Sequence, residues 1–184
     1  MSKSTKIRSE EELHAGDLIS YRVKKWEVPG WTVDHYAIVI APRGDSKFKI
    51  IEVHRPTGQD STDPDAATSD VDSGAESAES SEPHSYKVKE RVMDLGKHIS
   101  NGTLYRYDYE PTECNEPAEV IQNARSKIGP YDYHYVRNNC EHFARWCKTG
   151  ERVSYQTRFV EPMVSAVETK KGATKNFYKQ FFGW

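Results

Sequence analysis

The stretch Asn138-Asn139-Cys140-Glu141-His142-Phe143 carries the most information about this chain of 184 residues. After it, apolar residues recur at helical spacing from Cys140, and Gly150 provides a stop signal. Either asparagine is a natural N-cap, which places Cys140 in the first turn of a short helix. There the helix dipole and the unpaired backbone amides stabilise a thiolate by about 0.5 to 2 kcal/mol. An isolated cysteine is more commonly a buried core residue, so the nucleophile interpretation needs further support.

Two upstream histidines, His35 and His54, supply that support if they lie in a hairpin. Residues 35–41 and 48–54 are rich in strand formers, and residues 42–46 between them have the composition of a turn. The two segments are therefore predicted to pair antiparallel. A helix-start cysteine and two imidazoles would then supply a nucleophile, a base and a group that orients the base.

The register of this hairpin decides whether the histidines meet. If Gly44-Asp45 is a two-residue loop, Arg43 faces Ser46, and counting back along both strands places His35 opposite His54. Directly opposed residues point to one face, with Cβ atoms about 5 Å apart. A register shift of one residue would instead send one histidine to the other face.

The remaining chain predicts a scaffold for this hairpin. Alternating patterns favour strands over residues 17–23, 86–93 and 103–109, which would join the hairpin in an antiparallel sheet. A helix is predicted to begin at Pro117 and to end at Gly129-Pro130. Its apolar stripe comprises Val120, Ile121, Ala124 and Ile128.

Three segments of the chain resemble those of a known family. They are Ala15-Gly16-Asp17-Leu18-Ile19, the pair formed by His35-Tyr36-Ala37-Ile38 and His54, and Asn139-Cys140-Glu141-His142-Phe143. They are similar to segments of the lecithin retinol acyltransferase (LRAT) domain family, and within it to the small phospholipase A/acyltransferase group. The resemblance covers about residues 13–160. It implies an α+β fold of the circularly permuted papain-like (NlpC/P60-type) class, with an antiparallel sheet packed on helices.

The resemblance also implies the roles of the candidate residues. Cys140 corresponds to the nucleophile, His35 to the general base and His54 to the orienting third member. His142 belongs to the motif but follows Cys140 by two residues on a helix, so it is expected to point away and to be structural.

The implied activity is thiol-dependent acyl transfer from glycerophospholipids through a cysteine thioester. It comprises phospholipase A1/A2 hydrolysis and O- or N-acyl transfer. The same triad would serve a cysteine peptidase or amidase of the superfamily equally well. A non-catalytic module that binds membranes or partners is a third alternative, which intact Cys140, His35 and His54 disfavour.

Acidic and basic residues are distributed unevenly along the chain. Eight of the 28 acidic residues and none of the 26 Lys and Arg residues lie between residues 56 and 85, so the rest of the chain is net positive. That segment has almost nothing to bury and is predicted to be disordered. The expected organisation is an N-terminal arm (1–12), a catalytic domain (13–160) with an acidic insertion (57–84), and a basic aromatic tail (161–184).

The positive body and the tail suit peripheral contact with an anionic membrane, although plain solvation explains the charge equally well. Neither a nucleic-acid partner nor a cofactor is expected, and the oligomeric state stays open. Cys114, Cys140 and Cys147 lack disulfide-like spacing, and no apolar signal segment or membrane-spanning run occurs, which predicts a cytoplasmic protein. Cys140, His142 and Cys147 lack the paired spacing of a zinc site, so no metal is expected.

Overall fold

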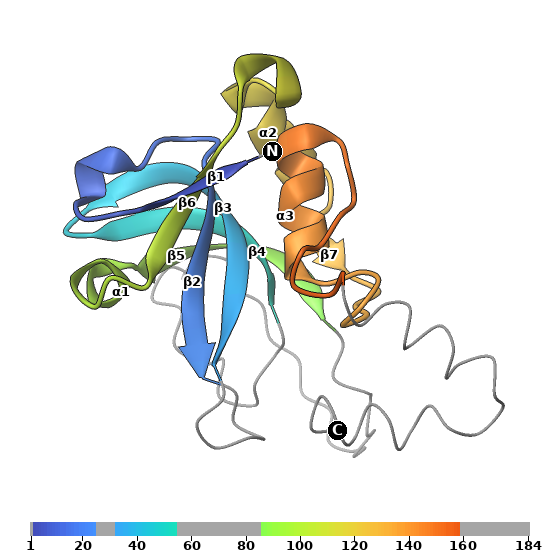
Figure 1. The fold of residues 1–184 in the computed structure, drawn as a ribbon, viewed down its shortest axis with the longest axis horizontal. Helices are drawn as coiled ribbons and strands as arrows, with labels where there is room; N and C mark the ends of the chain where they lie inside the picture. Colours follow the sequence, from blue (N-terminus) through green and yellow to red (C-terminus); the bar gives the residue numbers. More distant parts are fainter. Residues whose placement is uncertain (1, 25–31, 55–85, 159–184) are drawn as a thin grey trace, which may run out of the picture.

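One antiparallel sheet organises the part of the chain that the computed structural model describes, residues 2–24, 32–54 and 86–158. Within these residues the sheet has seven strands in the order β1-β6-β2-β3-β4-β5-β7 (Figure 1). The strands are β1 (Lys3–Lys6), β2 (Leu18–Lys24), β3 (Thr32–Gly44), β4 (Lys47–His54), β5 (Lys87–Asp94), β6 (Leu104–Asp108) and β7 (Gly129–Pro130). The helices are α1 (Gly96–Ser100), α2 (Pro117–Arg125) and α3 (Cys140–Thr149), with 3-10 turns η1 (Glu10–Glu12) and η2 (Pro111–Glu113). The predicted α+β class is confirmed.

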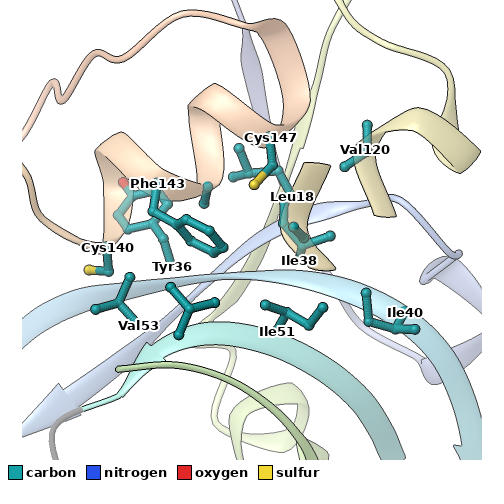
Figure 2. Packing of buried hydrophobic residues seen from close by; sticks show 13 residues of the cluster. Leu18, Tyr36, Ile38, Ile40, Ile51, Val53, Val120, Cys140, Phe143 and Cys147 are labelled. Carbon is teal, nitrogen blue, oxygen red and sulfur yellow. The ribbon is translucent and has the colours of Figure 1, made fainter. Parts of the chain in front are cut away.

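Both faces of the sheet are covered, which explains why consecutive residues are buried in the centre of β3 (36–40) and of β4 (50–53). On one face, Ile38 and Ile51 pack against Phe143 of α3, and α2 lies beside them (Figures 1 and 2). On the other face, Ile19, Ala37, Val39 and Ile50 pack with Leu13, Leu95 and Leu104. Helix α3 is therefore held directly against the hairpin formed by β3 and β4.

The ends of the predicted elements needed some correction. Strands β2, β5 and β6 agree with the predicted ones to within one residue at each end, whereas β1 was not predicted and lies in the segment expected to be an arm. Helix α2 ends at Arg125, and Ile128 is 51% exposed, so its place in the buried stripe was wrong. The chain leaves the helix because the amides of Lys127 and Ile128 bond carbonyls only three residues back, which tightens the last turn into β7. The predicted acidic insertion and basic tail lie outside the described residues.

The tip of the β3–β4 hairpin also differs from the prediction. Gly44 pairs with Lys47, so the two-residue loop is Asp45-Ser46 rather than Gly44-Asp45. Both loop residues have positive φ, 50° and 58°, as a type I′ turn requires. Two register shifts lie between this turn and Val39. These shifts compensate for the error in the predicted position of the turn. Beyond them, Ile38 pairs with Ile51 in the predicted register.

Helices α2 and α3 are seated against the start of β2. Gly16 has φ of +84°, and a Cβ there would lie 2.6 Å from the Cα of Pro117, the first residue of α2. The Lys148 ammonium in α3 donates a hydrogen bond of 3.1 Å to the Gly16 carbonyl. Only glycine fits this close approach at positive φ. Among the helices of the described residues, none has the length and apolar character needed to cross a bilayer.

Candidate active site

Cys140 is the first residue of α3, as predicted, and is 7% exposed. Asn139 is the N-cap, and its side-chain oxygen accepts hydrogen bonds from the backbone amides of Glu141 (2.9 Å) and His142 (3.1 Å). The Asn139 side-chain amide donates to the Tyr135 carbonyl at 2.8 Å. The cap therefore fixes the loop before the helix as well as the helix start. Figure 2 shows the Cys140 side chain at this end of α3, next to Val53 of β4.

His142 and Glu141 hold the start of this helix in place. His142 Nδ1 accepts a hydrogen bond of 3.2 Å from the backbone amide of Asn139, which completes a capping box. The fully buried Glu141 carboxylate pairs with Arg145 at 2.8 Å and accepts hydrogen bonds from the Ser154 hydroxyl (2.7 Å) and the Gln156 amide (3.1 Å). Burial raises the pKa of Glu141, but the Ser154 and Arg145 hydrogen bonds hold it below its usual value. The carboxylate is therefore charged, and it ties residues 154–156 to α3.

The hairpin brings His35 and His54 to one face. Ala37 of β3 pairs with Glu52 of β4, which is the register that the prediction required. His35 lies two residues before Ala37, and His54 lies two residues after Glu52. Side-chain alternation therefore puts both histidines on the face of Ala37 and Glu52. His35 lies beyond the last pair of the β3–β4 ladder, and there its ring reaches the Cys140 thiol at the start of α3.

A carboxylate that the sequence analysis missed joins the two histidines. Glu52 is 1% exposed, and its Oε2 lies 3.2 Å from Nε2 of His35. Its Oε1 lies 3.8 Å from Nδ1 of His54 and 2.7 Å from Nε of Arg91. The signal was a single acid between the apolar residues Ile51 and Val53, two residues before a candidate histidine.

Charge at this site favours a protonated His35. Burial lowers the pKa of His35, but the negative charges of Cys140 and Glu52, with hydrogen bonds to both, raise it to about 10. Burial raises the pKa of Glu52, whereas His35, His54 and Arg91 bring it well below its ordinary value of 4.5. An imidazolium that lies between the Cys140 sulfur and a buried carboxylate suits a thiol nucleophile.

A comparison with family models gives a match over most of the chain. The family model described as lecithin retinol acyltransferase matches residues 11–153. The chain belongs to the lecithin retinol acyltransferase family. The match includes β2 through α3 and therefore His35, Glu52 and Cys140. Membership of the lecithin retinol acyltransferase family suggests acyltransferase- or phospholipase-type chemistry. A comparison with curated proteins gave no match.

Several tyrosine side chains pack against the core cluster that contains Cys140 in this member of the lecithin retinol acyltransferase family. Tyr133 stacks on Tyr86 with ring centroids 3.9 Å apart and meets Tyr135 edge to face at 5.1 Å. Burial, followed by the charge of Cys140, raises the pKa of Tyr133 well above its ordinary value. Tyr131 packs edge to face on Phe143 at 6.0 Å. Aromatic packing therefore extends the apolar cluster of which Cys140 is a member.

The structure also describes the surroundings of Cys147 and of the possible metal-binding side chains. Cys147 is fully buried in the core between α3 and the sheet, and burial raises its pKa to about 12. Across the described ranges 2–24, 32–54 and 86–158, no group of three or more His, Cys, Asp or Glu side chains is arranged to hold a metal ion.

Proposed function

We propose that the protein catalyses thiol-dependent acyl transfer from glycerophospholipids through a thioester on Cys140. The observation that carries the proposal is the contact of His35 with both the Cys140 thiol and the Glu52 carboxylate. In this assignment Cys140 is the nucleophile and His35 the general base. His54 is the third member of the set, coupled to His35 through Glu52.

The proposed reaction has two steps. His35 takes the proton from the Cys140 sulfur, and the thiolate attacks the ester carbonyl carbon of the lipid. In this proposal, backbone amides at the start of the helix donate hydrogen bonds to the oxyanion. When the intermediate collapses, the ester C–O bond breaks and His35 returns the proton to the departing lysophospholipid oxygen. Water, or the hydroxyl or amine of an acceptor, then gives its proton to His35 and attacks the thioester, which frees Cys140.

The lipid substrate is favoured by family membership and by the tyrosine rings that pack against the core cluster of Cys140. The fold proposed for this chemistry is the circularly permuted papain-like class, in which the histidines precede the cysteine in the chain. Peripheral contact with an anionic membrane and a cytoplasmic location complete the proposal. The positive charge outside residues 56–85 supports the membrane contact.

The direct test is mass spectrometry of the protein after incubation with phosphatidylcholine of one defined acyl chain. A mass increase equal to that acyl group, located on the peptide with Cys140, is expected. Cys140→Ala should remove the adduct, and Cys114→Ala is the matched control that should keep it. If the wild-type protein forms no lipid adduct but is acylated by a peptide ester, the peptidase or amidase alternative is correct.

A further inference from the structure

Glu52 is the acidic group that the two histidines of the site share. Each of its oxygens faces a different imidazole, Oε2 at 3.2 Å from His35 and Oε1 at 3.8 Å from His54. The side chain lies between Ile51 and Val53 in sequence, in a strand whose neighbouring residues are fully or almost fully buried. A carboxylate in such a position is costly unless partners satisfy its charge.

The partners of Glu52 come from three other strands. The Tyr21 hydroxyl on β2 donates to Oε2, and the Arg91 guanidinium on β5 approaches Oε1 at 2.7 Å. His35 approaches from β3. His98 of α1 lies over the Tyr21 ring at 5.0 Å, and Cys140 of α3 faces His35. Tyr21, His35 and Arg91 fix the position of the carboxylate, and His35 and Arg91 keep it ionised.

We propose that Glu52 is the positioning residue of this site, which orients the His35 ring through Nε2 and so leaves Nδ1 for the Cys140 thiol. The inference rests on the proposed function and adds to it the group through which His54 acts on His35. His54 and Arg91 hold Oε1, while Oε2 is directed at His35.

The charge of Glu52 affects the transfer of one proton between Cys140 and His35. It moves from the Cys140 sulfur to Nδ1 of His35, which gives a thiolate and an imidazolium, while Glu52 stays ionised. Because the Glu52 charge contacts the imidazole directly, it stabilises the imidazolium more than it repels the thiolate. Loss of this charge should therefore shift the pair towards neutral thiol and neutral imidazole.

The test is the rate at which iodoacetamide alkylates Cys140, followed on its peptide by mass spectrometry. Glu52→Gln keeps the side-chain size and removes the charge, so the rate at pH 7 should fall about 10-fold or more, which corresponds to a shift of one pKa unit. Glu52→Asp keeps the charge and should recover part of the rate. Glu90→Gln is the matched control, because Glu90 on β5 pairs with Lys49 (3.0 Å) and Arg125 (3.1 Å). This substitution should leave the alkylation rate of Cys140 unchanged.

The pH profile separates positioning from mere loss of structure. In Glu52→Gln the main rise of the alkylation rate should move to higher pH by about one unit. A purely structural role would lower the rate at every pH without moving the rise, and that result, or an unchanged rate, overturns the inference. Iodoacetamide needs no lipid, so failure of the lipid adduct test would leave this result independent.

A measurement on the unmodified protein keeps the inference testable if both Glu52 variants fail to fold by circular dichroism. Nitrogen-15 NMR of the imidazole rings reports which nitrogen of His35 carries a proton. A protonated Nε2 at pH 7 is required, because it faces the Glu52 carboxylate. An unprotonated Nε2 would overturn the assignment.

Discussion

Tyr21 and His35 face each other across β2 and β3, with ring centroids 5.4 Å apart in an edge-to-face contact. The hydroxyl of Tyr21 donates to the same Glu52 oxygen that faces His35. Tyr21 therefore contacts the base through its ring and the carboxylate through its hydroxyl. The position of the imidazole depends on a residue from a strand outside the hairpin.

Tyr21→Phe should separate these two contacts. The ring packing is retained, but Glu52 loses a hydrogen-bond donor inside the core. We expect the free energy of unfolding to fall by about 1 to 3 kcal/mol, as for other buried groups left with a missing partner. Acyl transfer should fall less than in Glu52→Gln. Urea denaturation and initial rates measure the two effects, and a loss of activity larger than that of Glu52→Gln would contradict the interpretation.

The three cysteines should differ in reactivity. Cys140 should be alkylated by iodoacetamide at pH 7 faster than Cys114 or Cys147, because it combines a helix start with a charged imidazole. Cys147 should be almost inert, since its pKa is about 12 and it is fully buried. Peptide mass spectrometry over time gives the three rates. Equal labelling in the native protein would refute the assignment of Cys140.

The two histidines should differ in the cost of replacement. His35→Asn removes the base and should abolish turnover, whereas His54→Asn should retain more activity, because another hydrogen-bonding group can face Glu52. Initial rates with a soluble short-chain ester give the order. The reverse order would mean that the roles of His35 and His54 are exchanged.

Stability should depend on pH through His35. Its pKa rises from an ordinary value of 6.5 to about 10 on folding. Its contribution is therefore complete below pH 6.5 and is lost as the pH rises towards 10. The free energy of unfolding of the wild-type protein should decrease across this interval. In His35→Asn the decrease should be smaller, as urea titrations at several pH values would show.

The acidic segment should affect vesicle binding. Deletion of residues 57–83 removes eight negative charges and no positive ones. Binding to anionic vesicles should become tighter at low salt, and the gain should fade as salt screens the charges. Co-sedimentation at about 20 mM salt, where the Debye length still exceeds about 20 Å, is the measurement. Unchanged binding there would remove the support for membrane contact.

The sequence predicted the parts of the site that depend on local signals. Asn139 caps α3 and places Cys140 in its first turn because the N-cap preference is a property of adjacent residues. The alternation of β2, with Ile19, Tyr21 and Val23 on one face, also holds because a strand has a period of two. These features needed no knowledge of distant contacts.

The features that escaped prediction depend on tertiary contacts. The position of Glu52 between apolar residues marked it as unusual, but its role depends on partners from β2, β3 and β5 as well as His54 of its own strand. Lys3–Lys6 is short and polar, and it becomes a strand only because β6 offers a free edge to pair with. Ile128 belonged to a helical stripe by spacing, but the tightened end of α2 turned it outward.

The two register shifts between Val39 and Gly44 make the hairpin adjustable in its length. The shifts change the offset between the strands near the tip, whereas the pairs from Val39 with Ile50 to Ala37 with Glu52 keep a constant offset. The segment that carries His35 is under tighter geometric constraint than the turn only a few residues away.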